Sequence, residues 1–396
     1  MYSPGMVGFG HIRRNASIAQ ALSRSTLEPA IVLIAEARQA GSLPMPAGVD
    51  WVTLPALRKE GDGWCKPRYL DVSNEDVISL RARVIKSAIK SFEPDVLIVD
   101  HLPKGAAGEL HRTLERVRRH GRTRCVLGLR DVLQDPLTVR RSLCDAATVG
   151  AIRDYYDAIW VYGDPAVYDQ VREYEFPEAV AEKVRYTGYL DQRSRLDYAG
   201  VQSTAMLSAL ASERFALCVV GGGQDGAAVA EAFIRAELPA DMAGLVVTGP
   251  YMPGQLRQRL RRLSERRPRL RLLEFVPEPA PLIQRADRVV AMGGYNTVCE
   301  VLSFEKHALI VPRVEPKPEQ WIRAERLRDL GLISLLHPDA LSPQAITGWL
   351  AQDLGLPPPC RSRIDFGGLR RIPGMLAEML EVSPRLESRS TVATVS

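Results

Sequence analysis

The stretch RVVAMGGYNTVCEVL at residues 288–302 joins an apolar run to an amphipathic one through two adjacent glycines. Residues 288–292 predict a buried strand, and a helix is expected to begin near Asn296. Gly293 and Gly294 then occupy the turn, where unpaired backbone N–H groups and the helix dipole attract an anion. The stretch therefore predicts an α/β fold with a diphosphate-binding corner at this turn.

Glu300 lies one turn into that helix. Its carboxylate would accept hydrogen bonds from the ribose hydroxyls of a nucleotide held at the corner. The alternative is structural, because Thr297 and Glu300 have the spacing of a capping box that would close the helix start. From these residues alone the two interpretations are equally good.

A second turn of the same kind follows. Residues 308–312 predict the next parallel strand, and residues 321–330 predict the helix after it. Glu319 and Gln320 therefore lie at the carboxyl edge of the same sheet, where open α/β sheets bind ligands. A carboxylate beside an amide suits the recognition of sugar hydroxyls. The alternative is that both residues only cap the helix.

The segment GFGH at residues 8–11 is a third candidate turn. Gly8 and Gly10 allow close approach of a ligand, and His11 could accept a proton from an attacking hydroxyl. The alternative is an N-cap histidine with a solvated ring. Because so few residues precede this segment, either the first strand is very short or the natural chain begins upstream of Met1.

The segment GGGQDG at residues 221–226 follows another apolar run. Gly222, Gly223 and Gln224 are candidates for contact with a phosphate or a sugar hydroxyl. The segment is not a P-loop, because the Gly-Lys-Ser/Thr ending is missing. A purely structural tight turn is nearly as good an interpretation.

Along the whole chain, short apolar runs alternate with helical patterns, which is typical of parallel sheets in an α/β fold. Strands are predicted at residues 30–34, 96–100, 125–129, 158–162, 215–220, 244–248, 270–275, 288–292 and 308–312. Helices are predicted at residues 15–23, 76–92, 106–119, 227–238, 321–330 and 366–381. A chain of 396 residues is long enough for two such domains.

We expect the following organisation of the chain. The predicted parts are an N-terminal Rossmann-like domain at residues 1–190, a linker at 191–203, a C-terminal Rossmann-like domain at 204–357, a helix crossing back at 358–384, and a disordered tail at 385–396. The boundaries follow a polar segment near residue 190, a run of prolines at residues 357–359 and a Ser/Thr-rich end.

The composition fits a cytoplasmic protein that binds anionic small molecules. The net charge of +5 is too diffuse to indicate nucleic acid. Six scattered cysteines form no metal or disulfide pattern, and we expect no metal. Arginines crowd residues 255–271; a solvated helix face is the favoured interpretation, and peripheral contact with anionic lipid at the inner membrane face is the alternative. The chain is expected to be a monomer or a homodimer.

Taken together, GFGH, GGGQDG and GGYNTVCEVL followed by PKPEQWIRAERLRDLGL resemble the MurG-like (family-28) glycosyltransferases, and most of all a bacterial branch of predicted glycosyltransferases. The likeness extends over nearly the whole chain and is strongest at residues 293–331. It implies a GT-B architecture, in which two Rossmann-like domains with parallel sheets face a cleft. At residues 221–226 glycine replaces the usual serine, which puts a side-chain contact from that loop in doubt.

The resemblance also implies roles for individual residues. On the donor side it places Gly222, Gly223, Gln224, Gly293, Gly294, Tyr295, Asn296 and Thr297 near the phosphates, Glu300 at the ribose, main-chain groups of Phe275 and Val276 at the base, and Glu319 and Gln320 at the transferred sugar. On the acceptor side it places Gly8, Gly10, Arg13, His101, Arg130 and Asp131. His11 and Glu319 are the catalytic candidates, with His11 as base or orienting group.

These expectations describe an inverting, metal-independent transfer of a glycosyl group from a nucleoside diphosphate sugar to an acceptor hydroxyl. The family favours a UDP-sugar, and no other cofactor is implied. One alternative is a nucleotide-sugar 2-epimerase on the same fold, for which Asp100, His101 and Asp131 are candidates besides His11. The other is a non-catalytic nucleotide-sugar-binding subunit.

Overall fold

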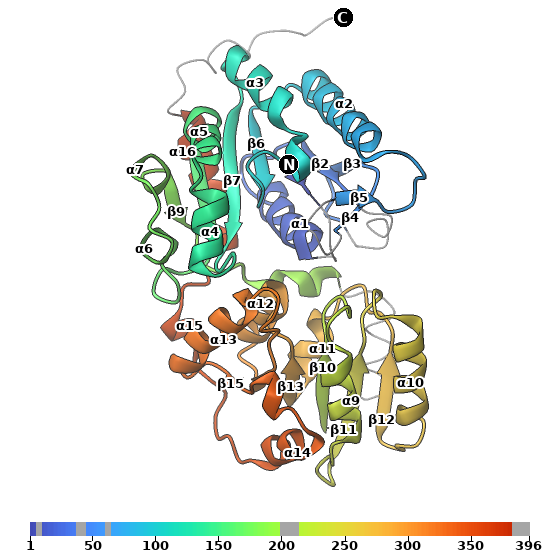
Figure 1. The fold of residues 1–396 in the computed structure, drawn as a ribbon. Helices are drawn as coiled ribbons and strands as arrows, with labels where there is room; N and C mark the ends of the chain where they lie inside the picture. Colours follow the sequence, from blue (N-terminus) through green and yellow to red (C-terminus); the bar gives the residue numbers. More distant parts are fainter. Residues whose placement is uncertain (5–9, 37–44, 60–64, 199–213, 382–396) are drawn as a thin grey trace, which may run out of the picture.

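The computed structural model describes residues 1–4, 10–36, 45–59, 65–198 and 214–381. Three predictions lie outside these residues: the site residue Gly8, the end of the linker at 191–203 and the disordered tail at 385–396. Two parallel sheets, one in each half of the chain, form the framework. In Figure 1 the N-terminal half lies above the C-terminal half.

The N-terminal sheet has seven strands in the order β3-β2-β1-β6-β7-β8-β9. Its strands are β1 (Tyr2–Ser3), β2 (Ile31–Ala35), β3 (Val49–Thr53), β6 (Val96–Asp100), β7 (Arg124–Arg130), β8 (Ala158–Tyr162) and β9 (Val184–Tyr186). All pairs are parallel, and every residue of β8 is buried. Continuous apolar runs are the expected composition of strands covered on both faces.

The C-terminal sheet has six parallel strands in the order β12-β11-β10-β13-β14-β15. Its strands are β10 (Arg214–Val219), β11 (Met242–Val247), β12 (Leu270–Leu273), β13 (Arg288–Ala291), β14 (Ala308–Ile310) and β15 (Ser334–Leu335). A small antiparallel hairpin, β4 (Leu57–Lys59) with β5 (Cys65–Pro67), belongs to the N-terminal half. The two-sheet α/β architecture predicted from the sequence is confirmed.

Helices connect the strands in both halves. In the N-terminal half they are α1 (Gly10–Ser23), α2 (Asn74–Phe92), η2 (Ala106–Gly108), α3 (His111–His120), α4 (Pro136–Leu143), α5 (Ala146–Tyr155), α6 (Gln170–Glu173), α7 (Glu178–Ala181) and η3 (Gln192–Tyr198). In the C-terminal half they are α9 (Ala227–Arg235), α10 (Gly254–Ser264), α11 (Ala280–Arg285), α12 (Tyr295–Ser303), α13 (Glu319–Asp329), η4 (Pro338–Ala340), α14 (Pro343–Ala351), α15 (Cys360–Arg363) and α16 (Gly368–Glu381).

The last helix, α16, packs on the N-terminal half. Leu369, Ile372 and Leu376 of α16 are buried in one apolar cluster with Ile18 and Leu22 of α1. Figure 1 shows α16, in red, among the blue and green elements of the upper half. The end of the chain therefore ties the two halves together.

The structure differs from the sequence prediction in several elements. The helix predicted at residues 106–119 is broken, because Ala107 has φ +51 and separates η2 from α3. The strands β3, β9 and β15 were not predicted, because they are short and carry polar or half-exposed residues. The helix predicted at 321–330 begins earlier, so that Glu319 and Gln320 belong to the first turn of α13.

The arginine-rich run at residues 255–271 covers α10 and the start of β12. Arg257, Arg259 and Arg261 form ion pairs with Glu231 or Glu274, and Arg267 and Arg269 donate to backbone carbonyls. Most of these charges therefore have partners within the chain, which supports the solvated helix face over a lipid-binding patch.

Candidate functional site

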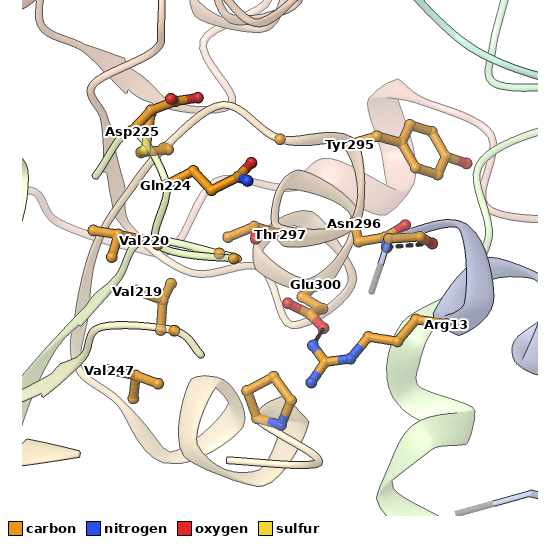
Figure 2. A pocket seen from close by; sticks show the side chains of 18 of the residues that line it. Arg13, Val219, Val220, Gln224, Asp225, Val247, Tyr295, Asn296, Thr297 and Glu300 are labelled. Carbon is orange, nitrogen blue, oxygen red and sulfur yellow. Dashed lines mark hydrogen bonds and ion pairs between the residues drawn. The ribbon is translucent and has the colours of Figure 1, made fainter. Parts of the chain in front are cut away.

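A cavity of about 270 Å³ lies between the two halves, at the carboxyl ends of the strands. Its N-terminal wall is formed by Gly10, His11, Arg13, Arg14 and Arg130. Its C-terminal wall is formed by residues 219–225, Val247, Gly249, Pro250, Phe275, Val276, Pro279, Met292, residues 294–297, Glu300, Arg313 and Gln320. Figure 2 shows part of this lining, with Arg13 reaching toward Glu300.

The predicted diphosphate corner opens into this cavity. Gly294 is the N-cap of α12, with φ −64 and ψ 141, and no side chain caps the helix. The first helical hydrogen bond joins the Val298 N–H to the Gly294 carbonyl at 3.0 Å, so the N–H groups before it have no helical partner. A Cβ atom placed on Gly294 would meet nothing within 4 Å. The corner thus presents free donors beside open space.

This geometry removes one alternative interpretation. A capping box requires Thr297 at the N-cap position, and that position belongs to Gly294. The interpretation of Thr297 and Glu300 as a capping box is therefore wrong. Thr297 instead lines the cavity.

Glu300 is buried, and its carboxylate lies 3.8 Å from the Arg13 guanidinium. Burial raises the pKa of Glu300 to about 7, although the charge of Arg13 opposes the shift. The carboxylate faces the cavity one turn below the glycine corner (Figure 2). A nucleoside diphosphate with its phosphates at the corner would bring its ribose toward this acceptor.

The side chains that follow the corner hold the two halves together. Asn296 Nδ2 donates to the Gly10 carbonyl at 2.8 Å, and the buried Tyr295 hydroxyl donates to the Tyr162 carbonyl at 2.8 Å. The main chain of both residues, and the second N–H of Asn296 Nδ2, remain as donors for a phosphate. The side chains of both residues are engaged at the interface.

Arg13, which was predicted on the acceptor side, lines the N-terminal wall of the cavity and also contacts the C-terminal half. Its guanidinium crosses from α1 to the C-terminal half and donates to the carbonyls of Pro277 at 2.7 Å and Val276 at 3.3 Å. The Val276 carbonyl is thus already an acceptor for Arg13 in the region where the resemblance places the base. Phe275 and Val276 both line the cavity.

The loop at residues 221–226 also reaches the cavity, where Gly222, Gly223 and Gln224 form part of the wall. Gly223 has φ +90, and a Cβ atom there would lie 2.2 Å from the Thr248 carbonyl oxygen. Glycine is therefore required at this position for backbone reasons. Asp225 of the same loop pairs with Arg313 at 2.7 Å.

His11 lies in the first turn of α1, which corrects the alternative of an N-cap histidine. Its Nδ1 atom is 2.8 Å from Asp100 Oδ2, and Asp100 ends β6. Arg14 donates to Asp100 Oδ1 at 2.5 Å, and Asn15 donates to Oδ2 at 3.1 Å. Asp100 therefore carries three partners and is almost fully buried.

The charges around this pair define the state of the imidazole. Burial opposes ionisation of Asp100, but the charges of Arg14 and His11 outweigh it and hold the pKa of Asp100 well below its ordinary value. Two groups contact Nδ1: the Asp100 carboxylate, which can only accept, at 2.8 Å, and Arg14 Nη2, which can only donate, at 3.0 Å. We assign the proton to Nδ1 because the contact with the carboxylate is the shorter, and this leaves Nε2 as the acceptor of the ring. Burial also lowers the pKa of His11, against the opposing charge of Asp100. The ring is therefore neutral at neutral pH and can take up a proton.

The remaining acceptor-side candidates have different positions. Arg130 lines the cavity with Gly10. His101 lies behind His11, with ring centroids 5.5 Å apart, and burial followed by the charge of Arg130 lowers its pKa well below the ordinary value. Asp131 is buried and accepts from Arg323 at 2.6 Å and from the Tyr189 hydroxyl at 2.9 Å. His101 and Asp131 do not line the cavity, and for Asp131 the acceptor-side prediction is corrected to an interface ion pair.

Glu319 and Gln320 also occupy different places. Gln320 lines the cavity, and its Oε1 atom accepts from the Arg313 N–H at 3.2 Å. Glu319 lies behind the wall, where its Oε1 atom pairs with Arg313 at 2.5 Å. Its Oε2 atom is buried and has no hydrogen-bond partner among the residues that the structure describes. The neighbouring residue Gln320, and not Glu319, therefore forms this part of the cavity wall.

Sequence reasoning did not find Arg14, Asn15 and Arg313 as parts of this site, and it considered Asp100 only for the epimerase alternative. These residues belong to the site through contacts with residues far away in the sequence, and the sequence alone carries no signal for such contacts. Asp100 does stand at the end of a predicted strand, and that position is a usable hint for a polar residue at the ligand edge.

A comparison with protein families finds a match for the part of the chain that forms the C-terminal wall of the cavity. Residues 216–347 match the model of the glycosyltransferase family 28 C-terminal domain. This segment is similar to the C-terminal domain of that family. It carries the glycine corner, Glu300 and Gln320, and thus most of the C-terminal wall of the cavity.

Two curated relatives, both from Haemophilus influenzae, support this family. Each is a UDP-N-acetylglucosamine–N-acetylmuramyl-(pentapeptide) pyrophosphoryl-undecaprenol N-acetylglucosamine transferase; they are 26% identical over 142 residues and 25% identical over 138 residues. Each alignment covers 35% of this chain and 39% of the relative. The aligned part thus spans well under half the length of these relatives.

Solved structures match over almost the whole chain. The calicheamicin glycosyltransferase CalG4 has a TM-score of 0.60 at 16% identity and covers 98% of both chains. MurG from Acinetobacter baumannii has a TM-score of 0.55 at 14% identity, covering 97% of this chain and 98% of its own. The UDP-GlcNAc 2-epimerase from Neisseria meningitidis has a TM-score of 0.58 at 12% identity, covering 93% and 98%. The chain therefore has the GT-B fold, which glycosyltransferases share with epimerases.

Within the described residues, none of the helices combines the length and the apolar character that crossing a membrane requires. The same part of the chain contains no group of three histidine, cysteine or carboxylate side chains arranged to hold a metal ion.

Proposed function

We propose that this protein transfers a glycosyl group from a nucleoside diphosphate sugar to an acceptor hydroxyl, with inversion at the anomeric carbon. The proposal rests on one observation above all. The uncapped start of α12 at Gly294 and the His11–Asp100 pair open into the same cavity from opposite halves of the chain. We expect uridine as the base, because the curated relatives are transferases that use UDP-N-acetylglucosamine.

In the proposed reaction, the phosphates lie against the first-turn N–H groups of α12, and the ribose hydroxyls donate to Glu300. The acceptor oxygen attacks the anomeric carbon from the side opposite the diphosphate. The bond between that carbon and the β-phosphate oxygen breaks, and its electron pair leaves with the diphosphate. The proton of the acceptor hydroxyl moves to Nε2 of His11, and Asp100 stabilises the imidazolium that forms.

The transferred sugar would lie near Gln320. The helix dipole and the N–H groups of α12 would stabilise the departing diphosphate without a metal. Closure of the two halves would exclude water from the activated sugar.

The epimerase alternative is less well supported by the geometry. It needs acidic and histidine groups on both faces of the sugar ring. Asp100 is buried behind His11, and neither His101 nor Asp131 lines the cavity. Consumption of the donor with release of free nucleoside diphosphate and no requirement for an acceptor would favour the epimerase.

A Gly294→Val substitution tests the proposed nucleotide site directly. Since nothing lies within 4 Å of a Cβ atom at Gly294, the branched side chain should fill the space of the diphosphate without disturbing the fold. We expect UDP at 100 times its Kd to stabilise the wild-type protein by about 2.7 kcal/mol. The variant should show no shift in melting temperature with UDP, and unchanged melting without it.

The matched control for this variant is Gly348→Val. Gly348 also has nothing within 4 Å of its Cβ position, and it is exposed on α14 away from the cavity. This control should respond to UDP like the wild type. Screening UDP, GDP, dTDP and their sugars identifies the base. If no nucleoside diphosphate stabilises the wild-type protein, or if Gly294→Val responds normally, the proposal fails.

The role of Glu300 predicts a pH dependence. Its pKa of about 7 in the free protein means that the carboxylate gains its charge between pH 6 and pH 8. The charged form accepts more strongly from the ribose hydroxyls, so UDP affinity should rise over this range. Glu300→Gln should bind UDP about 10- to 100-fold more weakly at pH 8 and should lack this part of the pH dependence. Isothermal titration calorimetry at several pH values measures both, and an identical profile in the variant would exclude this role.

A further inference from the structure

Arg130 differs from the other arginines that line the cavity. Arg13 lies 3.8 Å from Glu300, Arg14 lies 2.5 Å from Asp100, and Arg313 lies 2.5 Å from Glu319. For Arg130, no carboxylate lies within 4 Å among the described parts of the chain. The cavity therefore contains one arginine charge that the protein does not neutralise by a direct ion pair.

The hydrogen bonds of Arg130 are also incomplete. One guanidinium nitrogen, Nη2, donates to the Leu133 carbonyl at 3.1 Å. The Nε atom is buried and has no partner among the described residues. Burial, followed by the nearby charge of Arg323, lowers the pKa of Arg130 to about 10. The guanidinium thus stays charged at neutral pH, although its surroundings oppose the charge.

The position of Arg130 relates it to the glycine corner. Arg323, whose charge acts on Arg130, also donates to the Gly293 carbonyl at 2.9 Å. Arg130 and Gly294 line the same cavity from opposite halves. Arg130 therefore faces the cavity into which the glycine corner opens, and its charge also acts on His11 and His101 in the N-terminal half.

The chemistry of the leaving group explains what such a cation would do. Each phosphoryl group of the donor carries an ionised oxygen, and more negative charge develops as the glycosidic bond breaks. The start of a helix supplies only about half a positive charge. An arginine fork matches phosphate oxygens in geometry and in charge. A fixed cation aimed at the developing charge is a strong source of catalysis.

We propose that Arg130 is a catalytic residue that contacts the donor diphosphate from the N-terminal half of the chain. This inference rests on the proposed function and moves Arg130 from the acceptor side to the leaving group. It also gives domain closure a chemical role, because closure brings the N-terminal cation against phosphates held by the C-terminal half.

Calorimetric titration of Arg130→Gln with UDP and UMP tests the proposal. UMP lacks the β-phosphate, so the comparison isolates the group that departs. We expect Arg130→Gln to bind UDP at least 10-fold more weakly than the wild type does, with UMP affinity changed less than 2-fold. Arg130→Lys keeps a charge but loses the fork, and UDP affinity should fall by a smaller factor. Inorganic pyrophosphate, titrated in parallel, makes the result independent of the base.

The control variant is Arg262→Gln, which removes one exposed charge from α10 far from the cavity lining. It should bind UDP and UMP like the wild type. Melting curves without ligand establish that each variant is folded, and Arg130→Lys decides the matter if Arg130→Gln does not fold.

Unchanged UDP affinity in a folded Arg130 variant would overturn the inference and leave the proposed function intact. An equal loss of UDP and UMP affinity would also overturn it, because the β-phosphate would not be the group contacted. If the wild-type protein binds none of these ligands, the proposed function fails together with the inference.

Discussion

Replacing His11 with alanine should lower kcat/KM for glycosyl transfer by about 10²- to 10⁴-fold, the range typical of a lost general base. The physical reason is that Nε2 of His11 is the acceptor left free by the Nδ1 contact with Asp100. Affinity for UDP should change little, because the nucleotide is expected against the C-terminal wall. Steady-state kinetics with the donor found by screening, together with calorimetric titration, measure the two quantities separately.

His111→Ala is a suitable control, because His111 is an exposed histidine on α3 that lies outside the cavity lining and pairs with Glu115 of the same helix. It should retain full activity. Donor consumption that persists unchanged in His11→Ala and Glu319→Ala variants would contradict a catalytic role for these two residues. A wild-type protein that binds the nucleotide but consumes no donor by itself would favour a non-catalytic binding subunit.

The pH dependence of the reaction gives a second test of His11 as the general base. Because burial lowers the pKa of His11 from 6.5, the base is already neutral at pH 6.5 and becomes protonated only below it. The acidic limb of kcat, measured at saturating donor so that ionisation of Glu300 does not limit binding, should therefore fall below pH 6.5 in the wild type. A limb centred above pH 7 would show that another group limits the reaction.

Replacing Asp131 with asparagine should destabilise the protein by about 3–5 kcal/mol, since breaking a buried ion pair leaves an uncompensated charge. Asp131 and Arg323 are each about 1% exposed, and the carboxylate accepts from Arg323 at 2.6, 2.8 and 3.0 Å. Urea unfolding followed by circular dichroism measures the loss. Since Arg323 also donates to the Gly293 carbonyl, the variant should bind UDP more weakly as well.

Asp241→Asn is the control for this experiment. Asp241 forms an ion pair with Arg214 at 2.5 Å, but both side chains are more than half exposed. Solvent screens such a pair, so its loss should not measurably shift the urea midpoint. Equal effects of the two substitutions would show that burial of the Asp131–Arg323 pair does not determine its contribution.

The secondary structure and the glycine corner could be predicted from local sequence because their causes are local. The apolar runs of β6 and β8 match the observed strands residue for residue, and the double glycine marks the change from strand to helix. Where local signals are weak, prediction failed. The edge strand β3 has no fully buried residue, and Ala107 breaks a helix that its neighbours favour.

The assignment of side chains to the site needed the folded chain. The family resemblance placed Asp131 and Arg13 on the acceptor side. In the structure Asp131 forms a buried ion pair with Arg323, which is 192 positions away. Arg13 donates to the carbonyls of Val276 and Pro277, which are 263 and 264 positions away. Such pairings depend on how the two halves pack, and no periodicity or spacing records that.

The sequence by itself determined the class of fold, the positions of the strands with continuous apolar runs, and the backbone corner at Gly293 and Gly294. These features follow from local apolar patterns and from the conformational freedom of glycine. Only the tertiary structure decided that His11 pairs with Asp100, that Asp131 is structural, and that Arg130 is left without a counter-charge. The reason is that the state of a charge depends on burial and on neighbours brought together by packing, which the order of residues does not specify.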